Sequence, residues 1–259
     1  MNRNISVIYV LWLRAMKRFI RSPSQIIGSV AMPILFLLFL DAGFSSLGKF
    51  LGLPAGVSYL DFLVPGIIGM SMLFAATTSG ISLLWDKQFG FLKEVMVAPV
   101  QRVSIVIGRV LGGLTTALIQ STLLIIISLF IGFSIPTILS ILEAYGFMFL
   151  IGIIFISLGL IIASFMKDMQ GFGLILNLLI FPLFFLSGAI YPITALPSIV
   201  KYITYLNPLT YGVDGMRSVL IGVSVFGPMG GYIDAAVLII VALVMLILAS
   251  ISFSKGKII

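Results

Sequence analysis

Long apolar segments recur along this chain from residue 26 to residue 253, and most reach the roughly 20 residues that a helix needs to cross a bilayer. The polar intervals between them are short. Soluble domains carry about a quarter charged residues, whereas this chain has 9% charged and 61% hydrophobic residues. No water-soluble fold can bury so much apolar surface. The sequence therefore predicts an all-α membrane protein, with residues 1–259 forming a single transmembrane domain.

We predict six membrane-spanning helices from the length and position of these segments. They cover residues 25–44, 62–85, 105–133, 144–165, 171–186 and 233–253. Pro33 lies inside the first span and predicts a kink there. An even number of crossings places both termini on the same side of the membrane.

The N-terminal segment, residues 1–22, contains an apolar stretch that is too short to cross a membrane. On a helix its basic residues gather on one face and its apolar residues on the opposite face. The basic face holds Arg3, Arg14, Lys17, Arg18 and Arg21, and the apolar face holds Ile5, Ile8, Trp12, Met16 and Phe19. This pattern predicts an amphipathic helix on the membrane surface, with the basic residues toward anionic headgroups. The alternative is an ordinary solvated basic face.

Basic residues are distributed unequally between the segments on the two sides of the predicted spans. One side holds Arg3, Arg14, Lys17, Arg18, Arg21, Lys87, Lys93, Arg102, Arg109, Lys167, Lys255 and Lys257, whereas the other holds Lys49, Lys201 and Arg217. Cytoplasmic segments of membrane proteins carry an excess of lysine and arginine. We therefore expect a multi-pass protein of the cell (plasma) membrane with both termini cytoplasmic. This topology accounts for the net charge of +7 without a nucleic-acid partner.

The sequence lacks the residues that several kinds of site require. It contains no cysteine and no histidine, which excludes disulfides, thiolate or imidazole metal sites and nucleophiles that need a histidine base. It contains no GxxxxGK[ST] phosphate-binding loop. The acidic residues lie near the predicted span ends. An ion-coupled carrier would instead place ionisable residues at mid-membrane. We expect no catalytic residues, metal or bound cofactor, and an energy source that resides in a partner.

Two connections between the spans are longer than a turn, and such loops tend to carry function. The inner connection, residues 86–104, predicts a short helix whose apolar residues are rimmed by charge, which suits a groove on a protein partner. An interfacial helix on lipid is the alternative. The outer connection, residues 187–232, contains apolar stretches shorter than a span and bounded by prolines. It predicts a re-entrant or interfacial helical hairpin.

The outer connection carries a pattern that resembles the type-2 ABC-transporter permeases. The matching residues are Ile180, Leu183, Leu186, Ser187, Ala189, Leu196, Pro197, Pro208, Leu209, Tyr211 and Arg217. The apolar positions are individually common in membrane proteins, whereas the Pro-Leu-x-Tyr-x5-Arg ending is specific. A second resemblance covers the inner connection. It rests on Glu94, Pro99, Arg102, Gly108 and Arg109.

The resemblance implies the membrane half of an ATP-driven exporter. Such a subunit pairs with a second permease copy and with ABC-type ATPase subunits that carry the P-loop and bind the ATP. The branches that it resembles most export drugs or lipo-oligosaccharides, so the expected substrate is a drug-like amphiphile or a lipid, or alternatively a lipid-linked oligosaccharide or polysaccharide. The rivals are an ion-coupled secondary carrier or channel and a membrane scaffold. Both leave the pattern that ends at Arg217 unexplained.

The resemblance also assigns candidate residues to two sites. The expected ATPase-coupling residues are Lys87, Phe91, Glu94, Pro99 and Arg102. The expected outer gate consists of Tyr191, Pro208, Tyr211, Asp214 and Arg217. Helical spacing places Asp214 and Arg217 on one helix face, so an intrahelical ion pair is the simpler explanation for both charges. The functional alternative is that Arg217 holds the outer hairpin at the exit for substrate.

Overall fold

The computed structural model describes residues 3–45, 53 and 56–255, which form helices joined by short connections and contain no strand. The α-helices are α1 (Arg3–Ile20), α2 (Pro23–Phe44), α3 (Tyr59–Gln88), α4 (Phe91–Val97), α5 (Arg102–Ile131), α6 (Ile138–Phe165), α7 (Met169–Phe185), α8 (Ser198–Leu206), α9 (Pro208–Ile221) and α10 (Gly230–Lys255). Short 3-10 turns occupy Ile193–Ala195 and Gly227–Met229. The all-α class expected from the sequence is confirmed. Lys49 and Lys257, which entered the charge argument, lie outside the described residues.

Helices α2, α3, α5, α6 and α10 are long and apolar enough to cross a membrane, and they correspond to five of the predicted spans. The remaining predicted span, residues 171–186, corresponds to α7, which is apolar but has only 17 residues. The multi-pass architecture is thus confirmed. The six-span count stays a prediction.

Side-chain caps and special backbone conformations set several helix boundaries. The Ser58 hydroxyl accepts a bond from the Asp61 amide at the start of α3, and the Asp168 carboxylate accepts one from Gly171 at the start of α7. These acceptors satisfy amides that have no partner within the first turn. Gly132, at φ 118°, ends α5 in the left-handed conformation that favours glycine.

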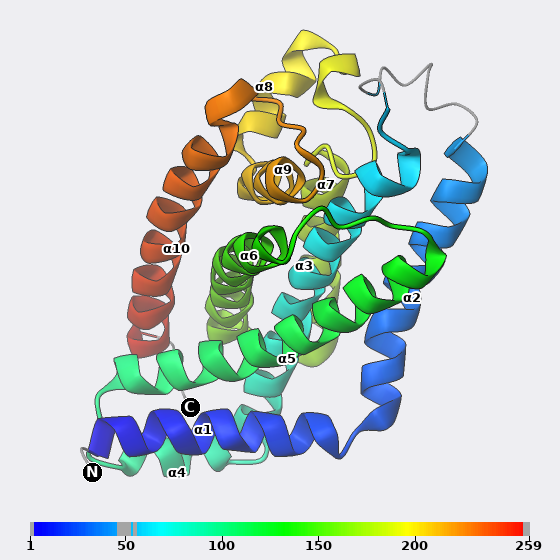
Figure 1. Ribbon diagram of the computed structural model, residues 1–259. Coiled ribbons are helices and arrows are strands. Elements are labelled where there is room, and N and C mark those ends of the chain that lie inside the picture. Colours follow the sequence, from blue (N-terminus) through cyan, green and yellow to red (C-terminus); the bar gives the residue numbers. More distant parts are fainter. Residues whose placement is uncertain (1–2, 46–52, 54–55, 256–259) are drawn as a thin grey trace.

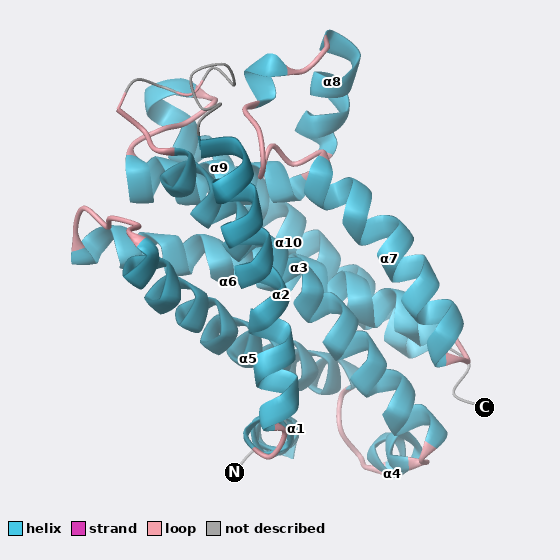
Figure 2. Cartoon of the chain, turned by 90° about the vertical axis from the view of Figure 1, so that its right-hand side faces the viewer, coloured by secondary structure: helices cyan, strands magenta, loops and turns pink. Residues whose placement is uncertain are grey.

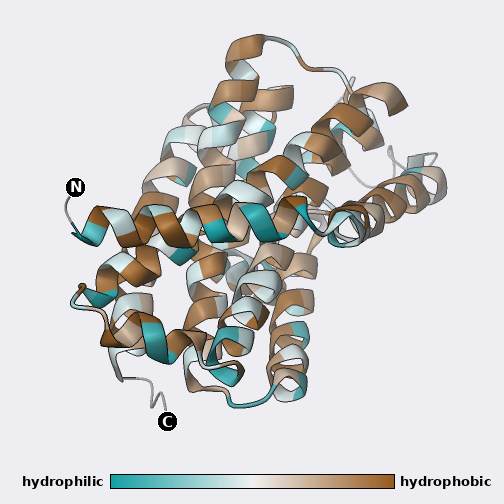
Figure 3. Ribbon diagram, turned by 90° about the horizontal axis from the view of Figure 1, so that it is seen from below, coloured by the Kyte–Doolittle hydropathy of each residue, from teal (hydrophilic) through white to brown (hydrophobic). Residues whose placement is uncertain are grey.

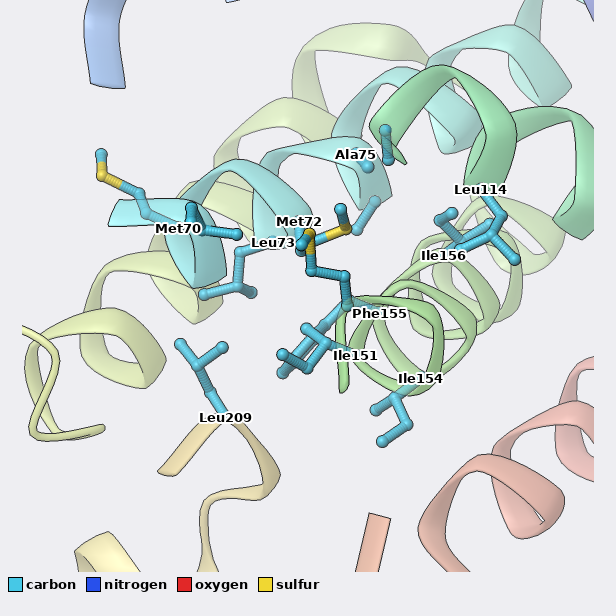
Figure 4. Packing of buried hydrophobic residues seen from close by; sticks show 14 of the residues in the cluster. Met70, Met72, Leu73, Ala75, Leu114, Ile151, Ile154, Phe155, Ile156 and Leu209 are labelled. Carbon is cyan, nitrogen blue, oxygen red and sulfur yellow. The ribbon is translucent and has the colours of Figure 1, made fainter. Parts of the chain in front are cut away.

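The core is centred on α3 and α6, which pack along each other with α5 and α9 beside them (Figure 4). Met72 and Leu73 of α3 and Phe155 of α6 are almost wholly buried, and Leu114 and Leu209 reach the same cluster from α5 and α9. Gly159 lets α6 approach α3 closely, because a Cβ at this position would overlap the carbonyl oxygen of Ala76. Small residues allow such backbone approach between membrane helices.

The two ends of the bundle differ in their elements. Helices α1 and α4 and the end of α10 lie at one end, whereas α8 and α9 lie toward the other (Figures 1 and 2). Helices α8 and α9 occupy the segment for which the sequence predicts an outer hairpin. Helix α9 packs against α3, α6 and α10, while Ile199, Tyr202 and Leu206 on α8 are exposed. Re-entry of this hairpin into the membrane stays a prediction.

We expect Gly159→Ala to destabilise the protein by about 1–3 kcal/mol, because the added methyl group meets backbone atoms that cannot rotate away. Gly146→Ala on the same helix is the matched control. A Cβ at Gly146 meets nothing within 4 Å, so the better helix propensity of alanine should leave stability equal or raised by up to about 1 kcal/mol. Thermal unfolding of both variants in detergent measures the difference. Equal melting temperatures would refute the close contact.

Candidate functional site

The inner connection folds as α4 between α3 and α5. Gly90, at φ 78°, turns the chain after α3, and Leu92 is fully buried against the helical core. By contrast, the side chains of Phe89 and Val97 are 80% and 85% exposed. Exposed apolar residues in a polar setting are a common feature of protein or membrane contact surfaces. Helix α4 is therefore anchored on one side and open on the other.

The predicted coupling residues divide between the surface and the interior. Glu94 and Pro99 are exposed on the α4 segment. Arg102 is also exposed, and its Nη1 donates to the Ser254 carbonyl oxygen at 2.5 Å, which joins the start of α5 to the end of α10. Phe91 is partly buried, and the Arg14 guanidinium lies 3.6 Å from its ring centroid.

Lys87 is directed into the bundle. Its Nζ donates to the carbonyl oxygens of Ala163 and Ser164 at 2.7 Å each. These carbonyls lie in the last turn of α6, which lacks N–H donors of its own for them and carries the negative end of the helix dipole. Lys87 thus closes the end of α6. The structure brings Phe91 next to α1, places Glu94, Pro99 and Arg102 on the surface, and turns Lys87 toward α6.

A buried carboxylate near the end of α3 is surrounded by three arginines. Asp86 accepts bonds from both terminal nitrogens of Arg14, at 2.9 and 2.7 Å, and from Nη2 of Arg109 at 2.8 Å. Arg18 reaches within 3.6 Å of the same carboxylate and donates to Ser82. The Asp86 side chain is 4% exposed, compared with 35% for Arg14. Bidentate charged bonds of this kind are among the strongest in proteins.

Helix α1 is held against α5 by close packing as well as by charge. A Cβ at Gly108 would lie 3.1 Å from the Ile8 backbone, and one at Gly112 would lie 2.7 Å from the Ala15 Cβ. The Trp12 indole nitrogen donates to Thr115 at 3.0 Å. Both glycines therefore pack on α1 within this chain. In the view from the α1 side, hydrophilic and hydrophobic residues alternate along the helix (Figure 3).

Arg217 of the predicted outer gate is buried, with 3% of the residue exposed. Its guanidinium donates to the carbonyl oxygens of Phe62, Gly188 and Ala189 at 3.1, 2.9 and 2.8 Å. It also lies 3.6 Å from the centroid of the Phe62 ring. Arg217 thereby joins α9 to the start of α3 and to the turn after α7.

Asp214 has different partners from Arg217. It accepts bonds from the Ser224 hydroxyl at 2.7 Å and from the Val225 amide at 2.9 Å. Within the described residues, all ion pairs involve Asp86. The intrahelical Asp214–Arg217 pair expected from the spacing is therefore wrong. The cause is that each side chain reaches backbone groups outside α9 that would otherwise be buried without partners.

The remaining gate residues position the ends of the hairpin. Pro208 occupies the first turn of α9, where its fixed φ suits a helix start. The Tyr211 hydroxyl donates to the Tyr205 carbonyl oxygen at 2.8 Å, which fastens α9 to α8. The Tyr191 hydroxyl donates to the Phe185 carbonyl oxygen, and burial raises the pKa of this phenol, so it stays a donor at neutral pH.

Sequence reasoning missed two connections. It treated Arg14 and Arg18 as a face without acidic partners, whereas Asp86 supplies the partner from α3. A single acid at the end of an apolar span was the available signal. It also missed Asn207, whose side chain caps α9 and donates to the Leu183 carbonyl oxygen at 2.6 Å. The position of Asn207 directly before Pro208 is a helix-start signal.

We expect Asp86→Asn to cost about 3 kcal/mol of stability, near the lower end for a broken buried ion pair because Arg14 and Arg18 keep contact with solvent. Arg109 would suffer most, since its side chain is only 8% exposed. Glu143→Gln, on an exposed residue, makes the same chemical change and should be neutral. Thermal unfolding and limited proteolysis of α1 measure the effect. Equal behaviour of the two variants would remove the structural role of Asp86.

Comparisons with known proteins agree with this architecture. The family model described as ABC-2 type transporter matches residues 6–221. Nodulation protein J of Rhizobium leguminosarum bv. viciae is 29% identical over 216 residues, which cover 83% of this chain and 79% of that protein. The inner membrane transport permease YadH of Escherichia coli (strain K12) is 28% identical over 223 residues, which cover 83% and 82% of the two chains. The protein thus belongs to the ABC-2 type transporter family of membrane permeases.

Proposed function

We propose that this chain is the membrane-spanning permease subunit of an ATP-binding-cassette exporter, driven by ATP hydrolysis in a separate ATPase subunit. The observation that carries the proposal is the α4 segment, which exposes Phe89, Glu94 and Val97 while Leu92 is buried in the bundle. An amphipathic segment of this kind suits a groove on a protein partner. The family match over residues 6–221 supports an ABC-type ATPase as that partner.

Motion of α4 can reach the spans through contacts that are already in place. Phe91 lies under the Arg14 guanidinium, and Arg14 in turn binds Asp86 of α3. Asp86 also binds Arg109 of α5. A partner that displaces α4 therefore acts on α1, α3 and α5 together. We propose that this linkage converts closure of the ATPase into a change of access in the membrane.

A six-span topology is supported by the contacts at the two ends of α7. At its start, the sulfur of Met169 accepts a bond from the Trp85 indole near the end of α3. At its other end, Leu183 is bound by Asn207, and the following Gly188 shares Arg217 with Phe62 near the start of α3. Helix α7 and its following turn thus run the length of α3. We propose that α7 is the additional crossing and that α9 re-enters from the outer side.

The site of action that we propose is the cell (plasma) membrane, with both chain ends cytoplasmic. In the most apolar 18-residue stretches of α2 and α10, only 17% and 22% of the residues are buried inside the chain. Their remaining surfaces are available to lipid and to a second permease copy, and a homodimer fits the expected arrangement. We propose an amphiphilic substrate, either a drug-like molecule or a lipid, with a lipid-linked oligosaccharide or polysaccharide as the alternative.

ATP hydrolysis and its coupling test this function. The purified chain alone should hydrolyse no ATP, whereas co-expression with its partner ATPase should give an assembly whose hydrolysis needs both proteins. In that assembly Glu94→Ala should lower transport of an amphiphilic dye into inverted vesicles about tenfold per unit of hydrolysis, through loss of a charged contact. Lys167→Ala, on another exposed inner residue, is the control. Hydrolysis by the isolated chain, or normal coupling in Glu94→Ala, would contradict the proposal.

The outer hairpin tests the proposed gate. We expect Arg217→Lys to assemble and hydrolyse ATP but to export poorly, since a compact ammonium lacks the planar fork with which the guanidinium reaches three separate carbonyl groups. Arg217→Ala leaves these buried acceptors unpaired and should cost about 3 kcal/mol or more. Lys201→Arg on α8 is the control. Wild-type dye export by Arg217→Lys would remove the gating role.

A further inference from the structure

A cavity of about 290 Å³ lies where α1 meets the ends of α3 and α5. Its wall includes Arg14 and Arg18 from α1, Asp86 from α3 and Arg109 from α5. Gln25, at the start of α2, closes another side. The buried charge cluster therefore forms part of the cavity wall, and Phe19 and Gln25 bring the wall to the junction of α1 and α2.

The charges that line the cavity do not balance. The three guanidinium groups face one carboxylate, that of Asp86. Lys87 follows Asp86 in sequence, but its ammonium is bound to carbonyl oxygens at the end of α6. It therefore does not offset the positive charge of the cluster. Arg18 holds Asp86 only at 3.6 Å, so its guanidinium is the least committed of the three. The cavity thus keeps an excess of positive charge next to a low-dielectric interior.

One buried donor in the cavity wall has no acceptor. The Arg109 side chain is 8% exposed, and its Nε finds no hydrogen-bond partner within the described part of the chain. Buried polar atoms are almost always bonded, and an orphaned one calls for an explanation. Ser79 and Ser82 line the same space, whereas the hydroxyl of Thr116, which also lines it, already donates to the Gly113 carbonyl oxygen. An anion with several acceptor oxygens would satisfy this set of donors.

We propose that the cavity binds the phosphate group of an anionic phospholipid. Guanidinium groups match phosphate oxygens in geometry and charge. Basic pockets between membrane helices are suited to lipid headgroups. The apolar walls formed by Leu11, Phe19 and Leu160 provide contacts for acyl chains. A zwitterionic headgroup would bring a cation toward three arginines and is disfavoured.

The bound phospholipid would balance the excess positive charge that Asp86 alone does not neutralise. Asp86 holds α1 to the spans while an excess of cations accumulates around it. A bound phosphate removes that repulsion and bridges α1 to α5 through Arg18 and Arg109. The lipid therefore strengthens the attachment of α1, and Arg14 connects this site to Phe91 of α4.

Lipid-dependent thermal unfolding of the purified full chain in detergent tests the site. Phosphatidylglycerol at about ten times its Kd should raise the melting temperature by about 3–6 °C, and phosphatidylcholine should not. Arg18→Gln should weaken phosphatidylglycerol binding about tenfold or more, since it removes a charged donor. Arg21→Gln, which makes the same change outside this cavity, should keep the full shift. Native mass spectrometry counts the retained lipid directly.

Two further measurements keep the outcome decisive. Arg18→Lys retains the charge and should bind phosphatidylglycerol better than Arg18→Gln, which separates loss of the ligand from loss of the fold. Inorganic phosphate at the same concentration should produce no comparable shift. Equal shifts with the two phospholipids, or an unchanged shift in Arg18→Gln, would overturn the site. A shift with inorganic phosphate equal to that with phosphatidylglycerol would overturn its assignment to a lipid.

Discussion

One carboxylate holds together the helices at the end of the bundle where α1 and α4 lie. Asp86 is buried at the end of α3 and binds arginines from α1 and α5. A charge in this position is costly unless it is paired, and among the arginines Arg109, with 8% of its side chain exposed, depends on the pairing most. The consequence is that α1, which is joined covalently to the spans only through residues 21–22 before α2, is also fixed to α3 and α5. The surface of α4 rests on the same arrangement, because Arg14 also covers Phe91.

The end of the bundle that carries α8 and α9 is held together by a buried positive charge, and the partners of this charge are of a different kind. Arg217 binds backbone carbonyl groups and the face of Phe62, so no carboxylate is needed near it. Both anchors converge on α3, one near its start and the other near its end. A rigid α3 therefore connects the segment that would meet an ATPase to the hairpin that would release substrate. This shared element gives the two ends a physical connection without a direct contact.

The sequence predicted the elements well where a single physical signal dominates. Apolar length located the spans, and proline together with glycine located the breaks, as at Pro208 and Gly132. It predicted partners poorly, because pairing depends on which helices meet. Asp86 and Arg14 are 72 residues apart, and no local pattern relates them. Asp214 and Arg217 show the opposite error, since local spacing suggested a pair that tertiary contacts replaced.

The glycine contact between α5 and α1 differs in kind from the ion pairs beside it. Gly108 and Gly112 lie against backbone atoms of α1 and the Cβ atoms of Leu11 and Ala15, none of which moves when a side chain rotates. An arginine can stretch and keep its bond, whereas this contact is either closed or lost. Small movements of α5 should therefore carry α1 along as one body. Large ones should separate the two helices abruptly, which makes this contact behave as a latch with two positions.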